Sequence, residues 1–202
     1  MSGRIRGLYG IADADAAGGD PERLAVQMLE GGCRLLQLRC KGWAASDTLV
    51  VARALVPRCR ELGATLIIND VPEVAAASGA DGVHVGQTDG PSPHIRHRLG
   101  PGRLLGRSAN RLEELGAARD GADYVAFGPL YDTANLSRPK PVQGPALLIR
   151  ARAIVPAHIP LVAIGGITTE RLGELRAQAD AWAVIGAIAG ADDPVAATRM
   201  LL

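Results

Sequence analysis

Aromatic residues are scarce in this chain, whose 202 residues include only three Tyr, two Trp and one Phe. Proteins that bind single-stranded nucleic acid stack bases on aromatic side chains within a basic surface. The net charge here is only +1, from 22 Lys and Arg against 21 Asp and Glu. We therefore expect no nucleic-acid partner, and a core built from Ala, Val, Leu and Ile.

Long apolar runs and paired cysteines are also missing. No stretch reaches the roughly 18 unbroken apolar residues that span a membrane. No apolar segment of a signal peptide follows the arginines near the start. The three cysteines, Cys33, Cys40 and Cys59, form an odd number without a CxxC spacing. These absences predict a cytoplasmic protein with reduced thiols and no membrane association.

What the chain does contain is an alternation of short apolar runs and helical patterns. The apolar runs are continuous, which is typical of parallel strands buried on both faces. The predicted strands are Leu8–Asp13, Leu35–Arg39, Thr65–Asn69, Gly82–Val85, Leu104–Ser108, Tyr124–Gly128, Leu161–Gly165 and Ala183–Ile188.

Helical patterns separate these runs. We expect Asp20 and Ser46 to cap the starts of the first two helices. We also expect a glycine in left-handed conformation to follow the ends of many helices, beginning with Gly31 after the first. The predicted helices are Asp20–Glu30, Ser46–Leu62, Pro72–Ala77, Pro93–Leu99, Arg111–Arg119, Pro145–Ile154, Thr169–Gln178 and Pro194–Leu201.

Eight strand–helix units fill the chain at roughly 25 residues per unit, and eight such units most naturally close into a (β/α)8 TIM barrel. We expect residues 1–202 to form one TIM-barrel domain. An open, doubly wound sheet is the structural alternative, but no Gly-x-Gly-x-x-Gly follows the first predicted strand.

Polar side chains end most of the predicted strands, where a TIM barrel places its chemistry. Strand alternation puts Gln37, Arg39 and Lys41 on one face of the second strand. Two of these are cations, and two carboxylates, Asp70 and Asp89, follow the next two strands. One or two carboxylates suffice for Mg²⁺ when substrate phosphates complete its coordination. The pattern therefore predicts a metal-bound diphosphate at the mouth of the barrel.

Glycines end the last two predicted strands, at Gly165, Gly166 and Gly186. TIM barrels commonly bind phosphate at this place through backbone N–H groups and a helix N-terminus. We therefore expect a second, monophosphate group here. Each signal alone has a plain structural explanation, such as a turn or a core histidine, and only their convergence at one end of the barrel indicates a site.

These residues resemble the thiamine-phosphate synthase family, in the superfamily that it shares with TenI-type thiazole tautomerases. The resemblance covers nearly the whole chain and is most specific in Gln37-Leu38-Arg39-x-Lys41 and in the run from Ala80 to Asp89. It implies an alkyl-transferase reaction that needs Mg²⁺. Hydroxymethylpyrimidine diphosphate loses pyrophosphate, and the thiazole nitrogen of hydroxyethylthiazole phosphate attacks the exposed methylene carbon to form thiamine phosphate.

The resemblance also implies a role for each site residue. Gln37 and His84 would face the pyrimidine, and Asp70 and Asp89 would hold the Mg²⁺. The diphosphate would be bound by Arg39, Lys41, Asn69 and Ser108, and we assign catalysis to Arg39, Lys41 and Ser108. The thiazole phosphate would be bound by Thr133, Asn135, Gly166, Ile185 and Gly186.

The chain departs from the family pattern in two places. Asn135 and Leu136 stand where the family usually has a hydroxyl residue and a lysine, so Arg138 or Lys140 would have to supply the missing charge. Gly186 replaces a serine and keeps only the backbone N–H.

Two alternatives to a synthase remain because of these departures. One is a TenI-like thiazole tautomerase, and the other is a non-catalytic or altered-substrate paralogue that binds a thiamine precursor. The intact Asn69, Asp70 and Asp89, together with Pro129 where the tautomerases carry a histidine, favour the synthase. Nothing in the sequence decides between a monomer and a homo-oligomer.

Overall fold

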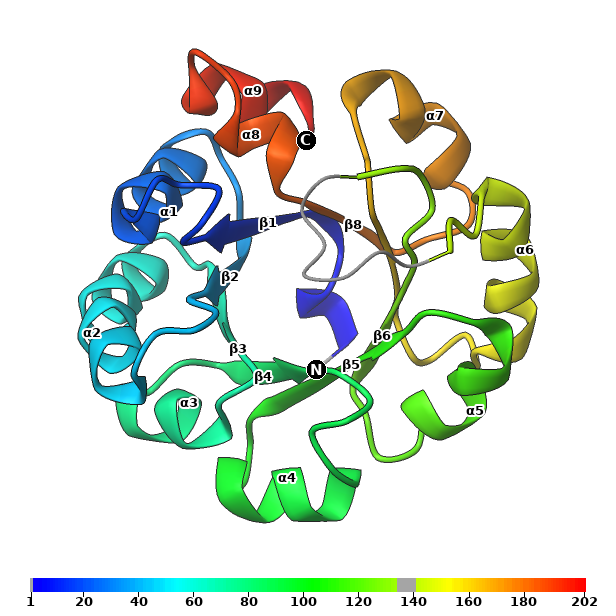
Figure 1. Cartoon of the computed structure of the whole chain (residues 1–202), viewed down its shortest axis with the longest axis horizontal. Coiled ribbons are helices and arrows are strands. Elements are labelled where there is room, and N and C mark those ends of the chain that lie inside the picture. The colour runs from blue at the N-terminus through cyan, green and yellow to red at the C-terminus, as the bar shows by residue number, and fades with distance from the viewer. Residues whose placement is uncertain (1, 134–140) are drawn as a thin grey trace.

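The computed structural model describes residues 2–133 and 141–202. Eight parallel strands pair in chain order, and the eighth also pairs with the first, which closes the sheet into a barrel (Figure 1). The predicted TIM barrel is thus confirmed. The strands are β1 (Gly7–Asp13), β2 (Leu35–Arg39), β3 (Thr65–Asn69), β4 (Gly82–Val85), β5 (Leu104–Ala109), β6 (Tyr124–Phe127), β7 (Leu161–Ile164) and β8 (Ala181–Val184).

Helices surround the barrel on the outside (Figure 1). Each of the two segments predicted over 111–119 and 169–178 is a 3-10 turn followed by one short α-helix, not one continuous helix. The α-helices are α1 (Pro21–Glu30), α2 (Ala45–Glu61), α3 (Pro72–Ser78), α4 (Ser92–Leu99), α5 (Leu115–Ala118), α6 (Pro145–Ile154), α7 (Leu172–Leu175), α8 (Gly186–Ala189) and α9 (Pro194–Met200). The 3-10 turns are η1 (Ser2–Arg4), η2 (Leu112–Glu114) and η3 (Thr169–Arg171).

The prediction for the last strand was wrong. A strand was expected over Ala183–Ile188, but β8 ends at Val184 and the next residues form helix α8. A short, continuous apolar run does not distinguish a buried strand from a buried helix. Gly186 is therefore the first residue of a helix at the mouth of the barrel, where its backbone N–H is left without an intrahelical partner.

The two predicted N-caps, Asp20 for α1 and Ser46 for α2, differ in outcome. Asp20 caps α1, because its carboxylate accepts a hydrogen bond from the backbone N–H of Arg23 at 3.0 Å, as predicted. Ser46 does not cap α2, which begins after Ala44; its hydroxyl lies 3.3 Å from the carboxylate of Asp47 instead. A serine within the first turn does not by itself mark which residue is the N-cap.

Gly31 was expected to be left-handed, and this was also wrong. Its φ is −68°, and the following residue, Gly32, has the positive φ of 103°. A Cβ atom on Gly31 would lie 2.5 Å from Cβ of Thr198 in α9. Glycine is therefore needed here for the close approach of two helices rather than for its backbone conformation.

Two apolar cores hold the barrel together. The larger lies between the strands and the surrounding helices, and the smaller fills the inside of the barrel. Tyr9 and Tyr124 are the largest side chains of the inner core and are almost completely buried. The inner core consists of Ile5, Tyr9, Ile11, Leu35, Ile67, Leu104, Tyr124, Ala126, Val162, Ala181 and Ala183. Two of the three tyrosines thus fill the inside of the barrel, where large volume is needed.

One arrangement recurs before β4, β6 and β8. An aspartate directly before each of these strands accepts a hydrogen bond from a backbone N–H of the preceding strand and pairs with an arginine. The N–H donors lie at 2.9, 2.7 and 2.7 Å, and the sets are Asp81 with Leu66 and Arg4, Asp123 with Leu105 and Arg96, and Asp180 with Leu161 and Arg152. We call these three sets the aspartate clasps. They lie at the N-terminal ends of the strands, the end of a TIM barrel that serves stability.

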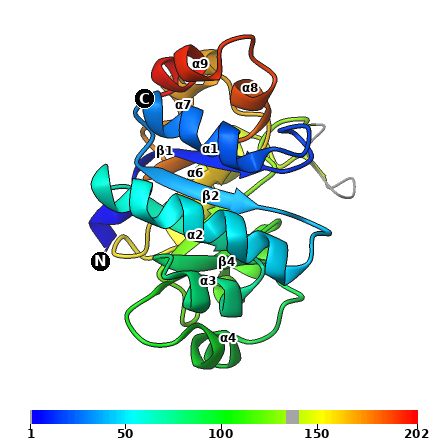
Figure 2. The same ribbon diagram turned by 90° about the vertical axis from the view of Figure 1, so that its left-hand side faces the viewer.

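The two ends of the barrel are clearly distinct in a side view. The arrowheads of β1 and β2 point to one end, and η1 lies at the opposite end (Figure 2). Within the described residues, no helix is long and apolar enough to cross a membrane.

Candidate active site

A cavity of about 680 Å³ opens at the C-terminal ends of the strands. Most of its lining residues come from the ends of β2 to β5 and the loops that follow them. They are Tyr9, Ile11, Gln37, Arg39, Lys41, Asn69, Asp70, His84, Gly86, Gln87, Thr88, Asp89, Ser108, Asn110, Ala126, Ile164, Ala183 and Ile185. The cavity therefore brings together eight of the residues predicted from strands two to five.

The end of β2 supplies an amide and two cations to this cavity. Gln37 and Arg39 alternate along β2 and both line the cavity, and Lys41 lines it from the turn beyond the end of the strand. The guanidinium of Arg39 forms a salt bridge with Asp13, whose side chain is 5% exposed at the end of β1. Asp13 does not line the cavity. Its carboxylate therefore orients Arg39 at the mouth.

A chain of hydrogen bonds crosses the inside of the barrel beneath the cavity. The amide of Gln37 donates to the hydroxyl of Tyr9 at 2.7 Å, and the hydroxyls of Tyr9 and Tyr124 are 2.9 Å apart. Tyr124 lies 3.1 Å from Nδ1 of His84, and Nε2 of His84 lies 2.9 Å from the hydroxyl of Ser108. Three buried contacts thus link Gln37 and His84, the two residues predicted to face the pyrimidine, and a fourth extends the chain to Ser108.

Both ring nitrogens of His84 are engaged, and its ring stacks on Tyr124 with centroids 5.4 Å apart. Burial, with the nearby charge of Arg107, lowers the pKa of His84 to about 4. Gly106 makes room for this arrangement, because a Cβ there would lie 2.1 Å from Tyr124 and 2.5 Å from His84. His84 is therefore a neutral residue with a fixed ring orientation at neutral pH.

Asp70 and Asp89 bring two carboxylates to the same wall of the cavity. Burial and the negative charge of Asp89 raise the pKa of Asp70, while a hydrogen bond from Asn69 and the charges of Arg39 and Lys41 oppose this rise. Asp70 also has a φ of 63°, a left-handed conformation that is uncommon outside glycine. The turn after β3 thus holds a carboxylate where a neighbouring carboxylate disfavours its charge.

Such a carboxylate pair fits a divalent cation. Mg²⁺ is usually bound by one or two carboxylates, with substrate phosphates and water completing its octahedral shell. The described residues contain no cluster of three or more His, Cys, Asp or Glu side chains placed for a metal. Asp70 and Asp89 therefore suit a cation that arrives with a phosphorylated substrate, rather than a cage made by protein alone.

The loop that carries Asp89 is held by Arg107, a residue of β5. The side chain of Arg107 is buried, and its guanidinium donates to the carbonyls of Gly90 at 2.8 Å and Gly86 at 3.2 Å. Inside the loop, the carboxylate of Asp89 accepts a hydrogen bond from the N–H of Gly86 at 2.6 Å. Arg107 thus fixes both ends of the turn that presents Asp89.

A second cavity, of about 230 Å³, lies beside the first. The two cavities share Ile164, Ala183 and Ile185 in their linings, so they adjoin. The second is lined by Asp132, Thr133, Ile164, Gly165, Gly166, Ile167, Thr168, Arg171, Ala183, Val184, Ile185, Gly186 and Ala187. Gly165 and Gly166 both have a positive φ, of 100° and 63°, and a Cβ on either would collide with the segment after β6.

The sequence matches the thiamine monophosphate synthase family over residues 8–188. The chain belongs to the thiamine-phosphate synthase family. Two curated relatives carry that name. One, from Chlorobium luteolum, is 40% identical over 95% of this chain and 89% of its own length, and the other, from Roseiflexus castenholzii, is 42% identical over 96% and 86%. Both names favour the synthase over the tautomerase and the non-catalytic paralogue.

A solved structure of the thiamine-phosphate synthase family shares the same fold. It is a thiamine phosphate pyrophosphorylase from Pyrococcus furiosus, 32% identical to this chain, with a TM-score of 0.88. The match covers 99% of this chain and 95% of the other. The likeness therefore extends to the whole barrel rather than to one motif.

The residues that the family resemblance pointed to divide between the two cavities. The larger contains those predicted for the pyrimidine, diphosphate and metal, and the smaller contains Thr133, Gly166 and Gly186. Ile185 lines both. Asn135 lies outside the described residues, as do Leu136, Arg138 and Lys140.

Sequence reasoning missed several residues that build this synthase-family site. Tyr9 and Tyr124 were treated as strand residues, although both hydroxyls belong to the chain of hydrogen bonds. Arg107 was included only as part of the predicted strand Leu104–Ser108, and Arg171 was not considered. A signal was available for Arg107, since an arginine within an otherwise apolar strand needs buried partners.

Proposed function

We propose that this chain catalyses the reaction of its family, the joining of hydroxymethylpyrimidine diphosphate and hydroxyethylthiazole phosphate into thiamine phosphate and pyrophosphate. The observation that carries the proposal is the pair of adjoining cavities. The larger contains cations and two carboxylates for a metal-bound diphosphate, and the smaller contains glycine N–H groups suited to a monophosphate. The two phosphorylated ends would thus be held apart with their reacting atoms between them.

The larger cavity is suited to the departure of pyrophosphate. Arg39 and Lys41 bring two positive charges to its mouth, and Asn69 and Ser108 add hydrogen-bonding groups. Negative charge grows on the leaving oxygen as the carbon–oxygen bond breaks, and fixed cations in a partly desolvated site stabilise that charge. Because Asp13 already orients Arg39, little reorganisation is needed during the reaction.

Asp70 and Asp89 would hold Mg²⁺, which supplies Lewis-acid neutralisation of the diphosphate. The chain's own contribution is the position of these carboxylates. The left-handed backbone at Asp70 and the hydrogen bonds from Arg107 to the Asp89 loop keep the two carboxylates on one wall of the cavity. The metal assignment is therefore testable through either carboxylate.

The pyrimidine is proposed to lie against Gln37 and His84. The pKa of His84, about 4, leaves its imidazole neutral at neutral pH, so it does not repel the electron-poor carbon centre that forms as pyrophosphate leaves. The thiazole phosphate would be anchored by Gly166, Gly186 and Thr133, which leaves the thiazole nitrogen to attack the methylene carbon. This positioning makes the bond-forming step effectively unimolecular.

We place the reaction in the cytoplasm and in one TIM-barrel domain formed by residues 1–202. All three cysteines are free thiols, which suits a reducing compartment. The strands of the described residues all belong to one closed barrel, which supports the domain assignment.

The direct test is formation of thiamine phosphate from the two phosphorylated precursors with and without Mg²⁺. We expect Mg²⁺-dependent product with the wild-type chain, and at least about a hundredfold lower kcat/KM for Asp89→Asn, because one charged ligand is lost. Asp192→Asn is the matched control, since Asp192 is exposed and lines neither cavity.

Two results would contradict this proposal. Full activity of Asp89→Asn would remove the metal assignment. Binding of both precursors without turnover at saturating Mg²⁺ would indicate the non-catalytic paralogue instead.

A further inference from the structure

The smaller cavity contains a cation that none of the sequence motifs included. Among its described lining residues, Arg171 is the only Lys or Arg. It is the last residue of η3, the turn that follows β7 and the Gly165-Gly166 pair. A phosphate in this cavity carries up to two negative charges, so Arg171 is the natural source of charge complementarity among the described lining residues.

Contacts hold the guanidinium of Arg171 in one place. It stacks on the ring of Tyr131, with 4.2 Å between its central carbon and the ring centroid, and it donates to the carbonyl of Gly166. Tyr131 is itself fixed by a hydrogen bond from its hydroxyl to Glu174 in α7. A stacked guanidinium is preorganised, so binding an anion costs it little side-chain entropy.

Arg171 keeps hydrogen-bonding capacity after these contacts. A guanidinium has five N–H donors, and within the described part of the chain only its contact with Gly166 uses one. The backbone N–H of Gly166 also has no acceptor among the described residues. The carbonyl of Gly166 thus binds Arg171, and the glycine turn whose N–H groups would bind phosphate lies directly beside this guanidinium.

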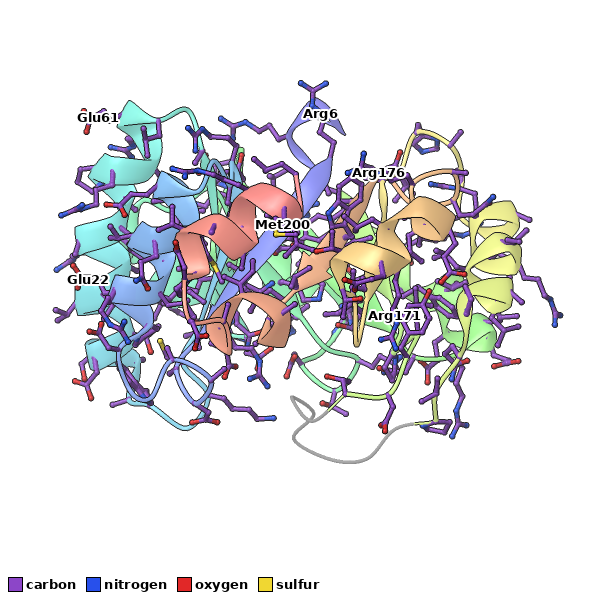
Figure 3. All side chains as sticks on the ribbon, turned by 90° about the horizontal axis from the view of Figure 1, so that it is seen from above. Arg6, Glu22, Glu61, Arg171, Arg176 and Met200 are labelled. Atoms are coloured by element: carbon purple, nitrogen blue, oxygen red, sulfur yellow. The ribbon has the colours of Figure 1, made fainter. Side chains whose placement is uncertain are left out.

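Arg176 provides a comparison within the same region. It stacks on Trp182 with 5.1 Å to the ring centroid and donates to the carbonyl of Leu202, yet it lines neither cavity. Figure 3 shows Arg176 toward the end of the barrel where Arg6 lies, and Arg171 toward the opposite end. Two arginines with similar packing therefore differ in whether they reach the site.

We propose that Arg171 binds the phosphate of the thiazole substrate and thereby selects the phosphorylated thiazole over the free alcohol. The proposal rests on the proposed function, since it takes the smaller cavity as the monophosphate site. Backbone N–H groups alone carry only partial charges, whereas Arg171 adds a full charge and two parallel N–H donors. The selectivity would thus come from a side chain of the β7 loop rather than from the glycine turn alone.

The test compares hydroxyethylthiazole phosphate with unphosphorylated hydroxyethylthiazole in wild type, Arg171→Gln, Arg171→Lys and Arg176→Gln. For Arg171→Gln we expect KM for the phosphate to rise about tenfold to a hundredfold, the usual range for a lost charged hydrogen bond. The kcat/KM for the alcohol and the KM for the pyrimidine diphosphate should stay within about twofold. Arg171→Lys should recover part of the loss, because it keeps the charge but not the planar fork.

Calorimetric titration of the thiazole phosphate onto each protein gives a readout independent of turnover. Arg176→Gln should match the wild type in both assays. Equal losses for the phosphate and the alcohol, or no change in either, would overturn the role of Arg171. Binding of the thiazole phosphate without formation of thiamine phosphate would overturn the proposed function. The titration of Arg171→Gln would then still decide whether Arg171 binds the phosphate. No binding of the thiazole phosphate by the wild type would overturn both.

Discussion

At the scale of single residues, the site depends on side chains whose surroundings set their state. Asp13 forms a salt bridge with Arg39, and burial together with the charge of Asp89 raises the pKa of Asp70. His84 is the clearest case, because it is buried, stacked on Tyr124 and hydrogen-bonded through both ring nitrogens. Its protonation state is decided by burial first and by the charge of Arg107 second.

This state predicts a pH dependence of stability. The pKa of His84 is about 4 in the folded protein and near 6.5 in an unfolded chain. Between these values the unfolded chain binds a proton that the folded protein does not, so stability is full above about pH 6.5 and falls as the pH drops toward 4. This contribution changes by at most about 1.4 kcal/mol per pH unit.

Urea unfolding at pH 7.5 and pH 5 would measure the effect. His84→Gln should lose less stability than the wild type between the two pH values, whereas the exposed His97, changed to Gln, should behave as the wild type does. The same pH sensitivity in His84→Gln and wild type would show that other groups cause it.

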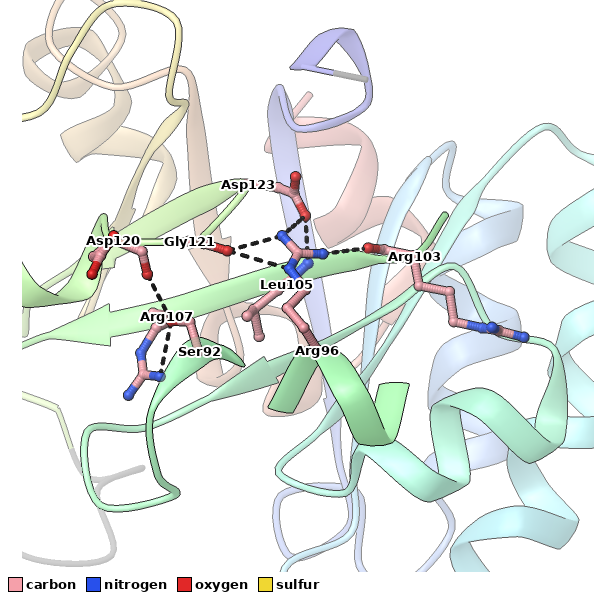
Figure 4. A network of polar contacts seen from close by, with 8 residues as sticks. All are labelled: Ser92, Arg96, Arg103, Leu105, Arg107, Asp120, Gly121 and Asp123. Atoms are coloured by element: carbon pink, nitrogen blue, oxygen red, sulfur yellow. Dashed lines mark hydrogen bonds and ion pairs between the residues drawn. The ribbon is translucent and has the colours of Figure 1, made fainter. Parts of the chain in front are cut away.

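At the scale of elements, loops and strand ends are fixed by charged side chains bound to backbone atoms. Arg107 joins the two ends of the loop that carries Asp89, and the hydroxyl of Ser92 lies between Arg107 and the carbonyl of Asp120 (Figure 4). The aspartate clasps do the same at the other end of the barrel. A buried charge with several backbone partners is costly to remove, since it leaves those partners unsatisfied.

Replacing Arg107 should therefore loosen the Asp89 loop before it affects the barrel. For Arg107→Met we expect amide exchange over residues 86–92 to accelerate about tenfold or more, as expected for the loss of a charged hydrogen bond. Hydrogen exchange with mass spectrometry would show this. Arg103→Met is the control, because Arg103 donates to the carbonyls of Leu99 and Ala76 outside this loop. An unchanged rate of amide exchange in Arg107→Met would show that the loop keeps its conformation without Arg107.

The aspartate clasps should matter for stability and not for catalysis. Removing the carboxylate in Asp123→Ala leaves the N–H of Leu105 without its acceptor and removes the ion-pair partner of Arg96, which keeps the carbonyls of Gly121 and Arg103. We expect a loss of about 1–3 kcal/mol in the free energy of unfolding, with kcat and KM of the folded enzyme unchanged. Asp120→Ala, at an exposed position, should change stability by less than about 0.5 kcal/mol. A fall in activity without a fall in stability would contradict this division.

At the scale of the whole molecule, closure of the barrel brings the first and last elements of the chain into contact. β1 pairs with both β2 and β8, and α9 lies beside α1 on the outside (Figure 1). The contact of Gly31 with Thr198 belongs to this seam between first and last elements. The indole N–H of Trp182 also donates to the carbonyl of Leu201 at 2.8 Å. The last residues thus close the fold.

Two adjacent leucines provide a test of this seam. Leu201 is 1% exposed and Leu202 is 50% exposed. Leu201→Ala should lower the free energy of unfolding by about 2–5 kcal/mol, as for other buried leucines, whereas Leu202→Ala should change it by less than about 0.5 kcal/mol. Chemical denaturation followed by circular dichroism measures both. Similar values for the two variants would show that α9 is not part of the cooperative structure.

The sequence alone determined the barrel and its polar end. Continuous apolar runs, separated by helical patterns, required parallel strands buried on both faces, and seven of the eight strands lie within two residues of their predicted ends. The side chains after those strands share one end because parallel strands all run the same way. The shared side of Gln37 and Arg39 followed from alternation along β2, which is a local rule, although Lys41 reaches the same cavity from the turn after the strand.

Only the tertiary structure decided how the remaining residues act. The end of β8 and the start of α8 depend on burial that an apolar run does not reveal. The chain of hydrogen bonds from Gln37 to Ser108 joins five strands of the barrel. Arg171 stacks on Tyr131, which lies 40 residues earlier in the sequence. These contacts depend on distances across the closed barrel, and no local pattern of residues encodes them.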